Sequence, residues 1–322
     1  MGSTTTTQDY PVTAQKVREI SDKITAEVGK VIVGKSEEVK MIVACLIAGG
    51  HALLQGVPGV AKTVIAKALA NSLSLQFRRI QFTPDLLPSD IVGTFIFDQK
   101  ASDFKLRQGP IFANIILADE INRASPKTQS ALLEAMQEKQ VTIEGTTLKL
   151  PLPFMVLATQ NPIEFEGTYQ LPEAQIDRFL MRIEVSYPSR QETIQILRRL
   201  KEIYEWNLNP VVDERTIQDV VQLLWKVNVD DSVAGYIADI VEATRKHPSV
   251  RLGGSPRAAT ALLTASSATA LIEGRDYVIP DDIKRVARHV LPHRLILTQE
   301  AILDGTSQAS VASAIINTVK VP

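Results

Sequence analysis

The sequence predicts an α/β protein in which a parallel β-sheet is covered by helices on both faces and is followed by an all-helical region. Between residues 49 and 149, short apolar runs alternate with amphipathic stretches, as strands joined by helices do. After residue 190, apolar residues recur at a helical period and strand-like runs largely disappear. We therefore expect a flexible tail over residues 1–12, an α/β core over 13–188 and a helical domain over 189–322.

Two helices are expected before the sheet. The apolar residues from Val17 to Val28 share one helical face, and Gly29 stands where this helix would end. A second helix is expected over residues 37–48. It contains the single cysteine, Cys45, in an apolar run, which indicates a packed thiol and not a reactive one.

Apolar runs predict the strands, and an amphipathic stretch over 64–75 predicts the helix between the first two of them. The expected strands are residues 51–55, 77–82, 115–118, 154–158 and 181–185.

Helical periodicity predicts the elements of the second region, which cover residues 191–204, 214–225, 231–246, 256–273 and 281–290. Ser189 and Asp281 stand where the N-caps of two of these helices would be. Pro280 and Pro292 bracket the last helix.

Composition narrows the class of protein. Hydrophobic residues make up 45% of the 322 residues, charged residues 22%, and the formal net charge is −1. These values exclude a disordered chain and give no support for an electrostatic nucleic-acid binder. No run approaches the roughly 20 apolar residues of a membrane helix. Residues 1–8 lack the parts of a signal peptide, so a cytoplasmic location is expected.

The segment 56–63, Gly-Val-Pro-Gly-Val-Ala-Lys-Thr, predicts a phosphate-binding loop. A nucleotide polyphosphate needs inward-pointing N–H groups, a mobile cation and a helix start. The segment follows an expected strand and precedes a helix that begins near Thr63. Lys62 would reach the β- and γ-phosphates of ATP, and the Thr63 hydroxyl would ligate Mg²⁺. A glycine-containing turn with a chance lysine is the alternative.

Ala61 departs from the strict form of this loop, which has glycine directly before the lysine. Because alanine tolerates a positive φ poorly, we expect residue 61 to have helical dihedral angles already.

Two further strands end in polar residues that suit hydrolysis. The strand before Asp119 and Glu120 should place both acids beside the loop, because parallel strands carry ligand groups at their C-terminal ends. Asp119 suits Mg²⁺ and Glu120 suits polarising the attacking water, whereas a solvated acidic turn is the alternative. Asn161, after the strand 154–158, could orient that water or touch the γ-phosphate, although Asn-Pro can also simply begin a turn.

Taken together, these segments resemble the AAA+ ATPases, and within them the MoxR group of the helix-2-insert branch. The matching segments are 56–63, 119–124, 129–137, 158–162, 171–179 and 255–258. The resemblance covers nearly the whole chain from Val31 to Leu295, and Ala61 is usual in the loops of this group.

The resemblance implies a ring, usually a hexamer, with ATP bound between subunits. Asp119 and Glu120 look like the Walker B acids, and Asn161 looks like sensor 1. Arg178 resembles the arginine finger that reaches into the neighbouring subunit's site. Arg257 projects from the first turn of a lid helix and resembles sensor 2, which couples the γ-phosphate to lid movement.

Val33 and Gly34 look like the stretch that packs on adenine. For Arg123 the sequence leaves a neighbouring nucleotide, the central pore and a structural salt bridge open. The residues expected to bind ATP are Val33, Gly34, Gly56, Val57, Pro58, Gly59, Val60, Ala61, Lys62, Thr63, Val64 and Asp119, of which Thr63 and Asp119 also hold Mg²⁺.

Two insertions also fit the resemblance. Residues 85–105 would carry the helix-2 insert, with 91–93 and 95–97 as strand-like parts. Residues 141–150, around Glu144 and Gly145, independently predict a β-hairpin and resemble the one inserted before sensor 1. Both would lie at one ring face or at the pore and touch a client protein.

The implied function is a MoxR-type ATPase that couples hydrolysis to remodelling, maturation or activation of partner proteins, in the manner of a chaperone. A partner that carries a von Willebrand factor A domain is expected with it. The alternative is a nucleotide-dependent binding switch or scaffold with incidental hydrolysis. A DNA-directed motor is disfavoured by the near-neutral charge.

Overall fold

Five parallel strands form the central sheet of the computed structural model, which describes residues 12–57, 59–100, 102–160 and 169–322. In sheet order they are β2 (Phe77–Gln81), β5 (Ile115–Asp119), β8 (Met155–Gln160), β1 (Ala52–Gln55) and β9 (Met181–Glu184). Every pairing within this sheet is parallel. The expected strands are confirmed, and the fold is α/β.

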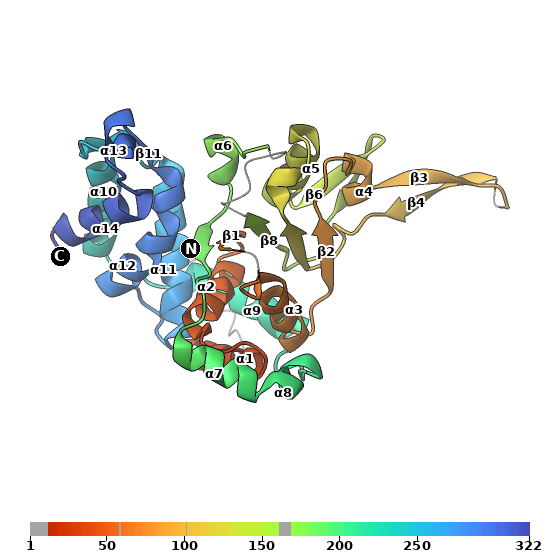
Figure 1. The fold of residues 1–322 in the computed structure, drawn as a ribbon, viewed down its shortest axis with the longest axis horizontal. Helices are drawn as coiled ribbons and strands as arrows, with labels where there is room; N and C mark the ends of the chain where they lie inside the picture. The colour runs from red at the N-terminus through yellow and green to blue at the C-terminus, as the bar shows by residue number, and fades with distance from the viewer. Residues whose placement is uncertain (1–11, 58, 101, 161–168) are drawn as a thin grey trace, which may run out of the picture.

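The sheet has a separate apolar core on each face because side chains alternate along its strands. Helices α1 (Ala14–Gly29), α2 (Ser36–Ile47) and α3 (Lys62–Ser72) cover one face, together with later helices. Helices α4 (Pro88–Val92) and α5 (Pro126–Glu138) cover the other (Figure 1). In β1, Leu54 packs into the first core and Leu53 into the second. A sheet covered on both faces is confirmed.

The first two helices begin and end close to the predicted residues. Thr13 caps α1, since its hydroxyl oxygen accepts a hydrogen bond from the Lys16 N–H, and the helix ends at Gly29. Cys45 is fully buried in α2, and burial raises the pKa of its thiol. The prediction of a packed, unreactive thiol is therefore confirmed.

The helix expected over 191–204 is broken in two at Arg199. Helix α7 (Arg190–Arg198) begins after the predicted N-cap Ser189, and α8 (Leu200–Tyr204) follows. Arg199 leaves the helical region because its guanidinium group donates to the carbonyl oxygens of Gly29 and Lys30 at the end of α1. Arg199 lies beyond residue 188, after which the helical domain was predicted to begin. Its hydrogen bonds to the end of α1 hold α7 and α8 against the core.

Helices α10 to α14 gather at one side of the molecule, opposite the β3–β4 ribbon in Figure 1, whereas α9 lies near the centre. The bounds of these helices are α9 (Glu214–Leu223), α10 (Asp231–Lys246), α11 (Pro256–Ile272), α12 (Pro280–Val290), α13 (Gln299–Leu303) and α14 (Gln308–Thr318), with a short ribbon of β10 (Val250–Leu252) and β11 (Ile296–Leu297). Of these, α9 lies against α2 of the core.

The N-cap predicted at Asp281 is wrong. Helix α12 begins at Pro280, so its N-cap is Ile279 and Asp281 lies inside the first turn. Proline at the first helical position fixes φ for the helix. The Asp282 carboxylate then accepts a hydrogen bond from the Ile279 N–H at 3.0 Å.

The first insertion differs from its prediction at one end. Residues 91 and 92 belong to helix α4 and not to a strand, because Pro88 begins the helix and the Asp90 carboxylate accepts from the Leu87 N–H. Strands β3 (Gly93–Asp98) and β4 (Asp103–Gln108) form an antiparallel ribbon that projects from the body (Figure 1).

The second insertion is confirmed as a β-hairpin. Strands β6 (Gln140–Ile143) and β7 (Thr146–Lys149) pair antiparallel. The turn between them, Glu144-Gly145, has positive φ at both residues, as a two-residue hairpin turn of type I′ requires.

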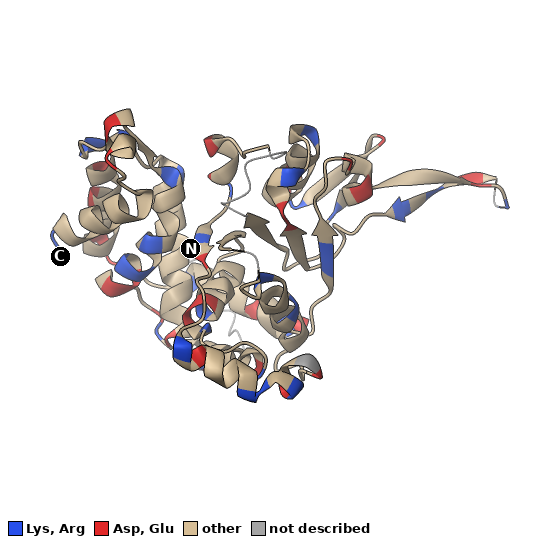
Figure 2. Cartoon of the chain, viewed as in Figure 1, with Lys and Arg blue, Asp and Glu red and all other residues tan. Residues whose placement is uncertain are grey.

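Charged side chains are interspersed over the molecule. Figure 2 shows basic and acidic positions scattered along the chain, with both signs present in the helical parts of the molecule. Among the described residues, no helix combines the length and the apolar character needed to cross a membrane.

Candidate active site

The phosphate loop connects β1 to α3 at the carboxyl edge of the sheet. Gly56 cannot accept a side chain, because a Cβ there would lie 2.3 Å from the Val185 carbonyl oxygen. Gly59 adopts φ +83° in open space, and Val60 is buried. Helix α3 begins at Lys62, so the first backbone N–H groups of this helix point toward the loop.

Ala61 does not have the predicted helical dihedral angles. Its φ is 63° and its ψ is 21°, in the left-handed region. The residue lies just outside α3, where the chain must turn from the loop into the helix. A left-handed alanine costs about 1–2 kcal/mol, which the loop imposes in spite of the residue's preference.

Lys62 and Thr63 occupy the first turn of α3. The Lys62 ammonium group donates to the carbonyl oxygens of Gly56 and Val57, across the loop. Burial lowers the pKa of Lys62, and the negative charges of Asp119 and Glu120 oppose that effect. The lysine is therefore a cation held at the centre of the loop, where a polyphosphate would replace the carbonyl oxygens.

Asp119 ends strand β5 and is buried. One of its carboxylate oxygens accepts from the Thr159 hydroxyl at 2.6 Å. The other accepts from Arg79, with distances of 3.0 Å to Nε and 2.7 Å to Nη2, and lies 3.5 Å from the Thr63 hydroxyl. The Asp119 carboxylate and the Thr63 hydroxyl, both possible Mg²⁺ ligands, are thus adjacent, and the Arg79 guanidinium group lies beside them.

Glu120 follows Asp119 in a left-handed conformation, with φ 56°. Its N–H donates to the Thr159 hydroxyl oxygen at 2.8 Å. Its carboxylate accepts from Gln81 at 2.8 Å and from Arg123 at 2.9 Å. Gln81 in turn accepts from Arg79 at 2.5 Å. The Gln81 and Arg123 contacts are made to the same Glu120 carboxylate oxygen, Oε2. Arg123 therefore makes the salt bridge that the sequence left open.

A cavity of 640 Å³ contains the loop and both acids. This volume suits a nucleotide-sized ligand. Its lining consists of Gly59, Ala61, Lys62, Thr63, Val64, Asp119, Glu120, Thr159, Ile196, Leu200, Ile203 and Trp206. The last four residues form an apolar wall contributed by α7, α8 and the segment after α8.

A second cavity, of 190 Å³, shares Gly59, Ala61 and Val64 with the first and is mainly apolar. Val33 lines it beside Val31 and Ile32. Gly34, at φ +77°, abuts Glu192 so closely that an added Cβ would lie 1.7 Å from the Glu192 carboxylate. The predicted adenine-binding stretch thus lies beside an apolar space next to the phosphate loop.

Arg178 and Arg257 lie away from the loop. Both line a different cavity, of 270 Å³, together with Lys139, Asp177 and Arg294. The Arg178 guanidinium donates to the Leu133 carbonyl oxygen at 2.8 Å, and Asp177 pairs with other arginines. The neighbouring residues Asp177 and Arg178 therefore have different partners.

Two predicted residues, Pro58 and Asn161, lie outside the described residues. Within the described part of the chain, no three or more His, Cys, Asp and Glu side chains converge on a possible metal position. Mg²⁺ at a nucleotide site takes one or two protein ligands, with phosphate oxygens and water completing its shell. The hydroxyl of Thr63 and the carboxylate of Asp119 fit that type of ligand.

Several residues of the site were missed by the sequence analysis. Arg79 and Gln81 lie on β2, two residues apart and therefore on one face, but only the pairing of β2 with β5 places them beside Asp119 and Glu120. Thr159 follows the expected strand 154–158 and lies two residues before Asn161, so its polar position at a strand end could have indicated a role in the site. The apolar wall of the cavity could not be anticipated, because its helices were expected in a separate domain.

Comparisons with known proteins agree with this geometry. The family model of ATPases associated with various cellular activities matches residues 51–181, and the AAA lid domain model matches 242–315. The uncharacterized protein YeaC of Bacillus subtilis is 49% identical over 301 residues, covering 93% of this chain and 94% of that protein.

Chaperone MoxR1 of Mycobacterium tuberculosis is 44% identical over 305 residues, covering 92% of this chain and 81% of that protein. A crystal structure of a Cytophaga hutchinsonii protein assigned as an ATPase superposes with a TM-score of 0.89 at 43% identity, covering 96% of this chain and 97% of the other. Since relatives of this similarity span nearly the full chain, the protein belongs to the MoxR family of AAA+ ATPases.

Proposed function

We propose that the protein binds ATP with Mg²⁺ between subunits of a homo-oligomeric ring, and couples its hydrolysis to ADP and phosphate to the remodelling or activation of a partner protein. The observation that carries this proposal is the joining of Lys62, Thr63, Asp119 and Glu120 in one cavity. The Lys62 ammonium group would bind the β- and γ-phosphates. The Thr63 hydroxyl and the Asp119 carboxylate would hold Mg²⁺, and Glu120 would polarise the attacking water.

In the proposed ring, a second copy of the chain would complete this site. Arg178 and Arg257 are absent from the residues that line the phosphate cavity, and both line another one. We infer that the two arginines act together on the nucleotide of a neighbouring subunit. For Arg257, the expected coupling of the γ-phosphate to lid movement would then involve the nucleotide of the neighbouring subunit. A hexamer is the proposed ring, because it is the usual assembly that the resemblance implies.

The client is proposed to be a protein. MoxR1, a relative 44% identical to this chain, carries the name chaperone. The β3–β4 ribbon offers exposed aromatic side chains, Phe97 and Phe104, in contact with each other at a ring separation of 5.3 Å. We retain a protein with a von Willebrand factor A domain as the proposed partner.

Replacing Glu120 with glutamine tests whether hydrolysis drives the function. Glu120→Gln keeps the size of the side chain but removes the carboxylate, so ATP should bind and not turn over. Loss of partner activation together with turnover supports remodelling by hydrolysis. Full activation without turnover would instead favour the nucleotide-dependent switch. Glu300→Gln, on α13 and far from the loop, is the matched control.

A further inference from the structure

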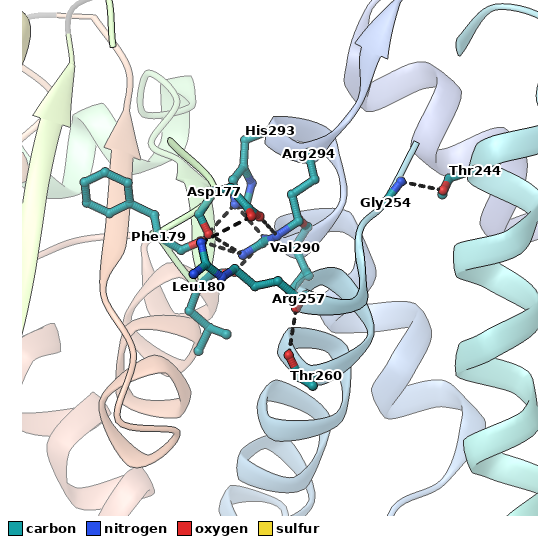
Figure 3. Close-up of polar contacts among 10 residues, drawn as sticks. All are labelled: Asp177, Phe179, Leu180, Thr244, Gly254, Arg257, Thr260, Val290, His293 and Arg294. Carbon is teal, nitrogen blue, oxygen red and sulfur yellow. Dashed lines mark hydrogen bonds and ion pairs between the residues drawn. The ribbon is translucent and has the colours of Figure 1, made fainter. Parts of the chain in front are cut away.

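Arg294 has a buried guanidinium group whose N–H groups all have acceptors, although its side chain is only 3% exposed. Nε donates to the Asp177 carboxylate at 2.8 Å. Nη1 donates to the carbonyl oxygens of Leu180 at 3.1 Å and Val290 at 2.6 Å. Nη2 donates to the carbonyl oxygens of Phe179 at 2.7 Å and Asp177 at 3.3 Å (Figure 3). Nη1 also lies 2.7 Å from the His293 Nε2, so the five donors of the arginine have six possible acceptors around them.

Apart from Val290 and His293, these acceptors belong to residues on either side of Arg178 in the sequence. Residues 177–180 connect α6 (Glu173–Ile176) to β9, and Arg294 donates to backbone carbonyl oxygens on both sides of Arg178. Arg294 itself belongs to the 3-10 turn Pro292–Arg294 after α12, in the C-terminal helical region. The guanidinium group of Arg294, in the lid region (residues 242–315), thus fixes the short segment that carries Arg178.

Asp177 extends the same contact to Arg257. One of its carboxylate oxygens binds Arg294, and the other lies 3.4 Å from the Arg257 Nη1 (Figure 3). The segment that leads into α11 is also held, because the Gly254 N–H donates to the Thr244 hydroxyl oxygen at 2.8 Å. The positions of both arginines therefore depend on the same carboxylate.

We propose that Arg294 is a positioning residue that, through Asp177 and the 177–180 backbone, holds Arg178 and Arg257 as one unit for the nucleotide of the neighbouring subunit. This inference rests on the proposed function. Burial lowers the pKa of Arg294 to about 10, so the group stays charged at neutral pH and is balanced by Asp177. Lysine has three donors in place of five and no planar fork, so it cannot satisfy the same acceptors.

The test uses mixed rings in which only one kind of interface is active. Glu120→Gln subunits donate their arginines but do not hydrolyse ATP, and Arg178→Ala subunits hydrolyse only when a neighbour supplies the arginine. Arg294→Lys is then added either to the donating or to the receiving subunit. Displacing a catalytic arginine by about 1 Å should lower the recovered turnover roughly ten- to hundredfold.

We expect that loss only when Arg294→Lys is on the donating subunit. Asp177→Asn on the donating subunit should also lower the recovered turnover. It replaces Arg294→Lys in the test if thermal unfolding shows that Arg294→Lys subunits are not folded. Arg275→Lys on the donor is the control, since Arg275 forms a comparable ion pair with Asp282 inside the lid region, 2.6 Å apart.

Equal losses of turnover with Arg294→Lys on the donating and on the receiving subunit would overturn the positioning role. That result would not contradict an active site shared between subunits. The absence of recovery in the starting mixture, before any change at Arg294, would overturn the composite site itself. The two failures are therefore distinguishable.

Discussion

Arg79 and Asp119 form an ion pair, with 2.7 Å between the Arg79 Nη2 and a carboxylate oxygen of Asp119. Asp119 is also the residue proposed to hold Mg²⁺. A guanidinium group at this oxygen competes with a metal ion for the same negative charge. The pair connects further, through Gln81, to the Glu120 carboxylate, so the metal-binding and water-polarising acids share one set of polar contacts.

Removing the competing cation should strengthen Mg²⁺ binding. In Arg79→Met, we expect the Mg²⁺ concentration that half-saturates binding of a fluorescent ATP analogue to fall by roughly two- to fivefold, the effect of an ion pair of about 0.4–1 kcal/mol. Arg78→Met is the matched control, because Arg78 is exposed and points to the opposite face of β2. An unchanged or higher Mg²⁺ requirement in Arg79→Met would show that the pair does not oppose the metal.

Lys62→Ala should abolish useful ATP binding. The alanine removes the only loop side chain proposed to neutralise the β- and γ-phosphates, and charge-assisted contacts of this kind contribute about 1.5–3 kcal/mol each. Isothermal titration should therefore give a dissociation constant for ATP at least roughly tenfold higher. Lys40→Ala on α2 should bind ATP normally. Equal affinities for Lys62→Ala and the unsubstituted protein would contradict the phosphate-loop assignment.

Ala61→Gly should stabilise the protein slightly. Glycine removes the left-handed strain of about 1–2 kcal/mol, while the greater freedom of the unfolded chain costs about 0.4–1 kcal/mol. We expect the free energy of unfolding in urea to rise by about 0.5–1 kcal/mol. Ala66→Gly, inside α3, should instead lower it by about 1 kcal/mol. Destabilisation of both variants by the same amount would mean that residue 61 is helical in solution.

His51 makes stability fall in mild acid. Its Nδ1 accepts from the Val156 N–H at 2.9 Å, so Nε2 carries the proton toward the Met136 carbonyl oxygen and the ring is neutral. Burial lowers the pKa of His51 from 6.5 to about 4. Between these pH values the unfolded chain binds a proton that the folded protein does not. Stability is therefore lost as pH decreases from 6.5 toward 4, by up to about 3 kcal/mol.

The His51 effect can be measured by comparing free energies of unfolding between pH 7 and pH 4.5. His51→Gln should start less stable and lose less stability over this range. A residual slope is expected, because burial also lowers the pKa values of His289 and His293. Parallel pH profiles for the variant and the unsubstituted protein would rule out the buried, neutral His51.

Local signals in the sequence were sufficient for the sheet and the phosphate loop. The strands are apolar runs bounded by polar residues, and Lys62 follows β1 at the start of a helix, so each could be recognised from neighbouring residues alone. The Glu144-Gly145 turn was predictable for the same reason, since its positive φ values follow from residue types between two alternating strands.

Tertiary contacts account for the features that the sequence did not reveal. Ala61 has a left-handed backbone because the loop must close on α3, which outweighs its helical preference. Arg199 breaks a periodic helix because carbonyl groups of α1, about 170 residues earlier, accept its hydrogen bonds. Arg257 lies beside Arg178 because of how the lid region docks, which no local pattern encodes.

The most direct test of a shared active site is ATP turnover in rings that mix Arg178→Ala subunits, which keep Lys62, with Glu120→Gln subunits. Each variant alone should be nearly inactive, the first for lack of a donated arginine and the second for lack of the water-polarising carboxylate. The account predicts that mixing restores turnover, with a maximum at intermediate ratios of the two subunits. Turnover that stays at the level of the separate variants at every ratio would contradict it.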